Sequence, residues 1–190
     1  MTIIDTIVDN IFVLDYLAAI LILLIVTILY IRKQMNKNYW ILYWIGVGLG
    51  LVWEIPIGLT RELGVPIAEF IKPRPVLPFP LHSIMHSIWD GGIFLVGIYL
   101  VYKILSSPHF KSVNKNELAV FILWGQIQSV ILEIVSLIIG LWNYIPSWWN
   151  PSMFEVSGHY FTLFPQYVWL IASIIFYYLT LKFNPDSSNF

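Results

Sequence analysis

The chain has 190 residues, of which 58% are hydrophobic and only 11% are charged, and its mean hydropathy is +0.77. A water-soluble domain of this length cannot bury so much apolar surface, so the composition indicates a multi-pass membrane protein. The net charge is −1 and the ten Lys and Arg residues are scattered, which argues against the basic stripe of a nucleic-acid-binding protein. No cysteine is present, so disulfides, thiol catalysis and thiolate metal sites are excluded.

Five apolar runs follow one another along the chain, each with roughly the 20 residues that a helix needs to cross a bilayer. The alternation expected of barrel strands is absent. We therefore predict an all-α bundle of about five transmembrane helices, forming a single integral membrane domain over residues 1–190. The predicted spans cover residues 11–31, 39–59, 81–104, 118–142 and 161–183.

The basic residues are distributed unequally between the two sides of this bundle. One side carries seven of them, in the first loop, the third loop and the C-terminal tail: Arg32, Lys33, Lys37, Lys103, Lys111, Lys115 and Lys182. The other side carries Arg61, Lys72 and Arg74. Because cytoplasmic loops are enriched in Lys and Arg, this bias predicts a cytoplasmic C-terminus and an external N-terminus. The two longer loops, 60–80 and 143–160, would then be external and would cap a cavity that opens on that side.

Three acids interrupt the apolar spans, and they are the most informative feature of the chain. Glu54, Asp90 and Glu133 lie in three different predicted helices. Counted from the predicted helix ends at 1.5 Å per residue, all three lie about 8 to 14 Å below the external surface. Ionisable groups in hydrocarbon are costly and usually face a protein interior or a functional cavity. The shared depth predicts a common site. The alternative is that each acid bonds a polar neighbour and holds helices together.

Two polar stripes run along the third and fourth spans at helical spacing. One contains His82, His86 and Asp90, at positions i, i+4 and i+8. We expect His82, near the interface, to make a structural hydrogen bond, and His86 to share or relay a proton with Asp90. The other stripe comprises Gln126, Ser129, Glu133 and Ser136, and we expect Gln126 and Ser129 to contact a ligand.

Aromatic residues accompany the acids. Trp53, Trp89 and Trp169 lie in the same layer, where an indole face attracts a cation by about one to a few kcal/mol when water is excluded. Together with Tyr144 we assign them to substrate binding. For Trp142 an interfacial anchor is the better interpretation, as is a solvated position for Asp15.

A carboxylic acid in an apolar pocket is a good proton donor because burial disfavours its anion. A chamber lined by tryptophans shelters a carbocation. We therefore expect a hydrophobic isoprenoid or sterol-like substrate, protonated by one acid and deprotonated by a second, without cofactor or metal. Glu54 and Asp90 are the expected acid–base pair, with Glu133 and His86 tuning or relaying protons.

A first span, a short basic turn and a second span ending in Val52-Trp53-Glu54-Ile55 resemble the membrane-integral terpene cyclases of fungal meroterpenoid and indole-diterpene pathways. The resemblance implies that Glu54 matches the essential glutamate in helix two of that family. The family has its other acid late in the chain, whereas the last span here has none, so Asp90 or Glu133 would have to substitute.

His86-Ser-Ile-Trp-Asp90-Gly, followed by Glu133-Ile-Val-Ser136, is similar to the emopamil-binding sterol isomerases. These carry a His-x-x-x-Glu pair and a later Glu-x-x-Thr, so Asp replaces Glu and Ser replaces Thr in this chain. Both resemblances cover short motifs, and both imply carbocation chemistry initiated by an acid.

Two other classes of function stay open at the level of sequence. A metal-dependent lipid enzyme would use His82, His86, Asp90, Glu133 and His159 as candidate zinc or iron ligands. A transporter, receptor or lipid-binding protein would bind a small molecule or membrane lipid without turnover, and a purely structural subunit would tolerate replacement of all three acids. The oligomeric state is not predicted.

Overall fold

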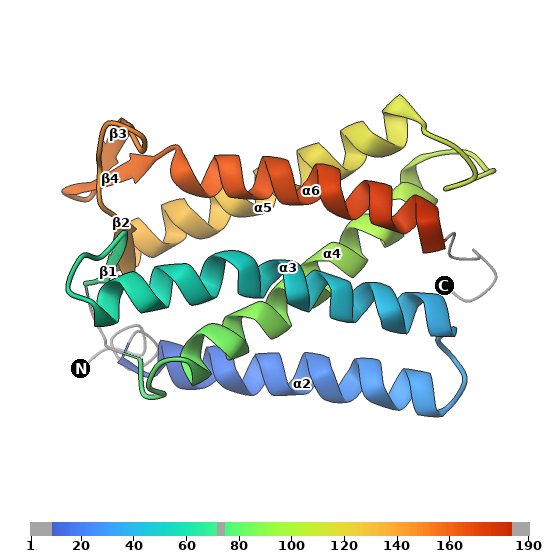
Figure 1. The fold of residues 1–190 in the computed structure, drawn as a ribbon, viewed down its shortest axis with the longest axis horizontal. Helices are drawn as coiled ribbons and strands as arrows, with labels where there is room; N and C mark the ends of the chain where they lie inside the picture. Colours follow the sequence, from blue (N-terminus) through green and yellow to red (C-terminus); the bar gives the residue numbers. More distant parts are fainter. Residues whose placement is uncertain (1–8, 72–74, 184–190) are drawn as a thin grey trace.

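The described part of the chain contains five long helices, as the sequence predicts. The computed structural model describes residues 9–71 and 75–183. Within them the helices are α2 (Ile11–Ile31), α3 (Lys37–Glu62), α4 (Leu81–Ile104), α5 (Lys115–Ile139) and α6 (Phe164–Phe183). Each is long and apolar enough to cross a membrane. In Figure 1 they lie side by side in an all-α bundle, and α4 crosses the others obliquely. The chain is thus a multi-pass membrane protein.

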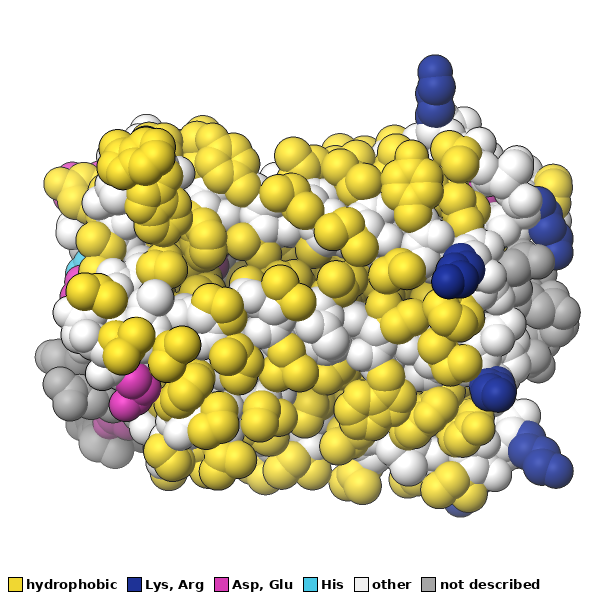
Figure 2. Space-filling model, in the orientation of Figure 1, with side chains coloured by type: hydrophobic (Ala, Val, Ile, Leu, Met, Phe, Trp, Pro, Cys, Tyr) yellow, Lys and Arg dark blue, Asp and Glu magenta, His cyan; other side chains and the backbone are white. Residues whose placement is uncertain are grey.

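The outer surface of the bundle suits a lipid environment. Apolar side chains cover the middle of the molecule in Figure 2, while Lys and Arg gather at one end. The most exposed helix is α2, where Leu17, Leu21 and Leu24 are each more than half exposed. Transfer of such a surface into hydrocarbon is favourable.

Short strands cover the other end of the bundle, where the sequence predicts irregular loops. β1 (Ala68–Phe70) pairs antiparallel with β2 (Trp142–Tyr144), so the two long loops are joined by backbone hydrogen bonds. β3 (Ser152–Val156) and β4 (His159–Thr162) form a second antiparallel hairpin. We call this the strand-bearing end. Lys72 and Arg74 lie outside the described residues.

Two helix boundaries lie inside the predicted spans, and the local sequence explains both. α5 ends at Ile139 rather than at 142, because Gly140 adopts the left-handed conformation (φ 69°) that terminates helices. α6 begins at Phe164 rather than at 161. The Phe164 N–H donates to Asn150 Oδ1 at 2.8 Å, and Pro165 follows in the first turn, where a missing N–H costs least.

The start and end of α3 also extend beyond the prediction. At its start, Asn36 Oδ1 accepts hydrogen bonds from the N–H groups of Asn38 and Tyr39, which caps the helix at Lys37. At its end, Arg61 belongs to the last helical turn rather than to a loop. The helix continues through Pro56, and the carbonyl of Glu54 accepts an additional hydrogen bond from Ser83 Oγ at 2.9 Å.

α3 and α4 approach each other closely because glycines lie at their contact. A Cβ on Gly91 would meet the Tyr43 carbonyl oxygen at 2.9 Å, and one on Gly46 would meet the Gly91 Cα at 3.0 Å. Small residues are the usual means of bringing two membrane helices together. This contact fixes Glu54 and Asp90 relative to each other.

The packed core occupies the end of the bundle that carries Lys and Arg. Its fully buried side chains are mainly aromatic: Tyr39, Tyr43, Phe110, Phe121, Phe176 and Tyr177. Phe94 stacks on Phe176 with ring centroids 4.4 Å apart and also contacts Trp169 at 5.3 Å. Toward the strand-bearing end the core stops at Trp169, and a cavity begins.

Candidate functional site

A cavity of about 710 Å³ lies between the helices at the strand-bearing end. This volume is in the range of small-molecule sites, which span about 300 to 1,000 Å³. All five helices contribute to its wall, and β1 and β2 cover it through Ala68, Phe70, Trp142 and Tyr144. The two long loops therefore lie over a cavity, as the sequence analysis expected.

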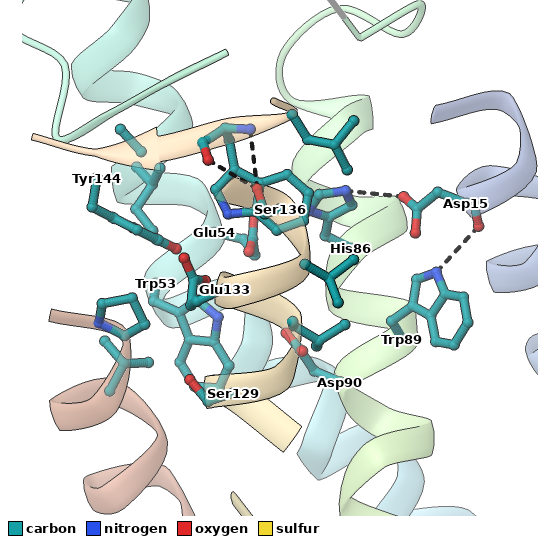
Figure 3. A pocket seen from close by; sticks show the side chains of 18 of the residues that line it. Asp15, Trp53, Glu54, His86, Trp89, Asp90, Ser129, Glu133, Ser136 and Tyr144 are labelled. Carbon is teal, nitrogen blue, oxygen red and sulfur yellow. Dashed lines mark hydrogen bonds and ion pairs between the residues drawn. The ribbon is translucent and has the colours of Figure 1, made fainter. Parts of the chain in front are cut away.

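Most residues assigned to the site from sequence line this one cavity. They are Glu54, Asp90, Glu133, His86, Trp53, Trp89, Trp169, Ser129 and Tyr144. Figure 3 shows all of them except Trp169 as labelled sticks, projecting from different elements toward a common space. Glu54, Asp90 and Glu133 are thus brought together from three helices, as their common depth indicated.

Gln126 is the one assigned residue that does not line the cavity. Its Nε2 donates to the backbone carbonyl of Gln166 at 3.0 Å, so its side chain joins α5 to α6. Gln128 lines the cavity instead, although its Nε2 donates back to the Gly125 carbonyl at 3.0 Å. The side chains of successive residues point about 100° apart around the helix axis. The polar stripe alone does not show which of its residues a neighbouring helix covers.

His86 lies between two carboxylates. Its Nε2 is 2.9 Å from Asp15 Oδ2 on α2, and its Nδ1 is 3.7 Å from Glu54 Oε2 on α3. Figure 3 shows the first of these contacts as a dashed line. The expected pairing of His86 with Asp90 is therefore replaced by pairing with Asp15 and Glu54, because α2 and α3 flank this face of α4. An imidazole between two carboxylates can take a proton on one nitrogen and release one from the other.

Asp15 is held in place by the residue that precedes Asp90. Trp89 Nε1 donates to the backbone carbonyl of Asp15 at 3.1 Å, which ties α2 to α4. The Asp15 side chain is 25% exposed, so it is partly buried and paired rather than solvated as the sequence analysis expected. One helical turn before His86, His82 Nδ1 lies 2.9 Å from Tyr16 Oη, in agreement with a structural hydrogen bond for His82.

Asp90 is buried, and its Oδ2 has no hydrogen-bond partner among the described residues. It lies so close to Gly50 that a Cβ there would collide with Oδ2. A buried polar atom without a partner costs about 1 to 3 kcal/mol, so the burial of Asp90 needs a physical reason. A carboxyl group kept free for a ligand is a physical reason for such an arrangement.

Glu133 faces the cavity from α5, beneath the β1–β2 ribbon. It is only 9% exposed, and Trp142 lines the same cavity. The Trp142 backbone is fixed in turn, because its N–H donates to Ser136 Oγ at 3.1 Å and its carbonyl accepts from the same hydroxyl at 2.9 Å. Trp142 is thus part of the site rather than the interfacial anchor expected from sequence.

Tyr144 contributes a phenol to the same region, with its hydroxyl toward Glu133 in Figure 3. Burial raises the pKa of the Tyr144 phenol well above its ordinary value, and the negative charges of Glu133 and Glu54 raise it further. The hydroxyl therefore stays protonated and can donate a hydrogen bond to a carboxylate or a ligand.

Aromatic rings close the inner end of the cavity. Trp53 and Trp169 lie with ring centroids 5.5 Å apart and join α3 to α6. Both line the cavity together with Trp89. The faces of such rings stabilise a nearby cation by about 0.5 to 2 kcal/mol each, depending on exposure.

The donors weighed for a metal site include two neighbours, since the His82 and His86 ring centroids are 4.2 Å apart. In the described ranges 9–71 and 75–183, no three His, Asp or Glu side chains are grouped so that they could hold a metal ion. His159 lies in β4 rather than at the start of a helix and is absent from the cavity wall.

Sequence reasoning missed Asp15 and Arg61 as residues of the site. Asp15 stands near a helix start, where acids are usually solvated, and Arg61 falls in the predicted loop 60–80. In the structure Arg61 lines the cavity, and its guanidinium carbon lies 3.8 Å from the centre of the Phe70 ring. The contacts of Asp15 with Trp89 and His86 can be recognised only once the arrangement of α2 and α4 is known.

The site therefore combines carboxyl groups, an imidazole bridge and indole faces around an apolar space. Such an arrangement can donate a proton to a bound lipid, shelter the resulting positive charge and accept a proton from another carbon. In comparisons with known proteins, the chain matches no family model, no curated protein and no solved structure.

Proposed function

We propose that this protein is a membrane-embedded isomerase or cyclase that acts on an isoprenoid or sterol-like lipid by acid–base catalysis. The observation that carries the proposal is the meeting of Glu54, Asp90 and Glu133, from three helices, in one apolar cavity with Trp53 and Trp169. Membrane helices rarely carry acids at such depth without a functional reason. The same chemistry is implied by the resemblance to membrane-integral terpene cyclases and to emopamil-binding sterol isomerases.

The proposed reaction begins at Asp90. Its Oδ2 has no hydrogen-bond partner among the described side chains, so the group is available to give its proton to a carbon–carbon double bond. One C–H bond forms and a carbocation results, which the indoles of Trp53 and Trp169 stabilise. Glu54 then removes a proton from a neighbouring carbon, and a new double bond forms. Atoms and charge balance, since one proton enters the lipid and one leaves it.

Before the next turnover Glu54 must lose a proton and Asp90 must regain one. His86 Nδ1 lies 3.7 Å from Glu54 Oε2, so the imidazole can take the proton from Glu54 and release one on its other side, at Asp15. Asp90 regains its proton from water once the product has left the cavity. Glu133, beside Tyr144, lines the same cavity and tunes or relays protons. No cofactor or metal is part of this proposal.

Solvent deuterium detects this chemistry before the substrate is known. The purified protein in nanodiscs is incubated in D₂O with a total isoprenoid and sterol extract, and the lipids are analysed by mass spectrometry. A protein-dependent gain of deuterium on carbon is expected, because the donated proton comes from an exchangeable carboxyl group. Asp90→Asn and Glu54→Gln are expected to lower incorporation by about 10² or more.

The matched control is Glu155→Gln, which changes an exposed acid in β3, away from the cavity. It is expected to incorporate deuterium at the wild-type rate. Full activity of both cavity variants would contradict the proposal, and lipid binding without any incorporation would instead favour a lipid-binding protein.

We further propose that the strand-bearing end faces away from the cytoplasm and that the C-terminus is cytoplasmic. Seven of the ten Lys and Arg residues flank helix ends on the opposite side, where Figure 2 shows dark blue side chains. The positive-inside rule then orients the bundle.

A further inference from the structure

The wall of the cavity reaches the protein surface between two helices. Among the cavity-lining side chains that the structure describes, the most exposed are Leu14 on α2 (45% exposed) and Ile131, Leu132 and Val135 on α5 (55%, 47% and 45%). All four are aliphatic. They therefore contact the cavity on one side and the exterior of the bundle on the other.

The oblique course of α4 explains why a gap exists there. Near the strand-bearing end α4 contacts α2, as the hydrogen bond from Trp89 Nε1 to the Asp15 carbonyl shows. Farther along the chain α4 contacts α5, where Trp124 Nε1 donates to the Ile93 carbonyl at 2.9 Å. Before Ile93, α4 and α5 diverge, and Figure 1 shows this crossing. The cavity occupies the space that this divergence leaves.

On the opposite side, none of the described cavity-lining residues of α3 and α6 is as exposed as these four. There α3 and α6 are in contact through Trp53 and Trp169, whose ring centroids are 5.5 Å apart. Ile57 and Pro165, which line the cavity nearby, are buried. A hydrocarbon chain dissolved in the bilayer therefore meets an apolar opening on the α2–α5 side and packed rings on the other.

The charge of the wall restricts what can enter. Four carboxyl groups line the cavity, from Asp15, Glu54, Asp90 and Glu133. Over residues 9–71 and 75–183, Arg61 is the single Lys or Arg in that wall. A lipid diphosphate carries several negative charges and would find mainly Arg61 and His86 to pair with them in this wall. An uncharged lipid needs no counter-charge there, and a cationic lipid can pair with a carboxylate.

We propose that the gap between α2 and α5 is a lateral portal through which an uncharged or cationic lipid passes from the bilayer directly into the cavity. This inference rests on the proposed function, since it specifies how the substrate arrives and which class it belongs to. The hydrocarbon body of the lipid lies between Leu14 and Leu132 during entry, and its polar or reactive end advances to Asp90.

The absence of cysteine makes it possible to plug the portal after folding. Leu132→Cys protein is purified, incorporated into phosphatidylcholine nanodiscs and modified with N-benzylmaleimide. A dodecylamine that carries a diazirine is then added through the lipid phase, and photolabelling is followed over time by peptide mass spectrometry. Labelling of cavity residues is expected, with the modified protein at least about tenfold slower than the unmodified one because the entry step is obstructed.

The matched control is Leu123→Cys, modified in the same way. Leu123 lies on the same helix and is 59% exposed, but it does not line the cavity. Its modification is expected to leave the labelling rate unchanged. Equal rates for the two modified proteins, or no label inside the cavity, would overturn the portal.

Deuterium incorporation, measured on the same nanodiscs, separates this inference from the proposed function. If the probe enters through the portal but no lipid gains deuterium, the portal stands and the catalytic proposal fails. If modified Leu132→Cys protein is labelled at the unmodified rate while deuterium exchange proceeds normally, the catalytic proposal stands and the portal fails. A dodecyl diphosphate analogue carrying the same diazirine is expected to label the cavity far less than the amine does.

Discussion

At the scale of single residues, Asp90 combines an unfavourable environment with a position in the cavity wall. Its Oδ2 is buried without a hydrogen-bond partner in the described part of the chain, which lowers stability unless something compensates. Residues that function requires are often retained at such a cost. Stability and activity should therefore respond to substitution in opposite directions.

We predict that Asp90→Asn leaves the free energy of unfolding unchanged or raises it by up to about 1 kcal/mol, because a neutral amide avoids the cost of protonating the carboxyl group that folding buries. The same substitution should abolish deuterium incorporation. Unfolding in mixed micelles of dodecyl maltoside and sodium dodecyl sulfate measures the first quantity. A loss of several kcal/mol would instead assign Asp90 a structural role.

Asp15 acts through His86 rather than on the lipid. Its carboxylate holds Nε2 at 2.9 Å and so directs Nδ1 toward Glu54. We predict that Asp15→Asn slows deuterium incorporation by about 10- to 100-fold, in the range seen when a residue that orients a functional histidine is removed. Asp15→Glu should recover part of the rate, and Asp9→Asn, at an exposed position before α2, should have no effect. Equal rates for Asp15→Asn and wild type would remove the proton relay from the mechanism.

At the scale of elements, the contact between α3 and α4 decides whether the acids meet. We predict that Gly91→Ala destabilises the protein by about 1 to 3 kcal/mol, because its Cβ would lie 2.7 Å from Val47 Cγ2 and 2.9 Å from the Tyr43 carbonyl oxygen, and backbone cannot move easily. Gly48→Ala on the same helix pair is the control. Nothing lies within 4 Å of its added Cβ, so it should stabilise α3 by about 0.5 to 1 kcal/mol. Equal effects of the two substitutions would contradict the close helix contact.

The helices themselves could be predicted because each depends mainly on its own sequence. A long apolar run must form helical hydrogen bonds in a bilayer wherever its neighbours lie, and α2 and α4 have the predicted bounds. The β1–β2 pairing could not be predicted in the same way. Its partners, Ala68 and Tyr144, are far apart in sequence, and three-residue strands carry no periodicity.

At the scale of the whole molecule, depth along each helix was predictable, but rotation about each helix axis was not. Counting residues from the span ends placed three acids in one layer, and the cavity contains all three. The partner of His86 depends on which helices flank α4, and that depends on packing throughout the bundle. The same information assigns Gln126 to the α5–α6 contact and Asp15 to the site.

The charge distribution of the whole molecule yields a prediction about its orientation. Lys and Arg gather at the end that carries the α4–α5 loop, and β3 lies at the other end. A cytoplasmic position for the basic end follows from the positive-inside rule. In right-side-out vesicles, Ser112→Cys in that loop should therefore be protected from a membrane-impermeant maleimide, and Ser152→Cys in β3 should react. Both positions are exposed and the chain has no other cysteine, so each signal has a single source. Permeabilised vesicles give the control, in which both variants should react. The reverse pattern would contradict the proposed orientation and would place the cavity and the β1–β2 strands near the cytoplasmic surface. The lateral portal opens toward lipid, so it would be unaffected.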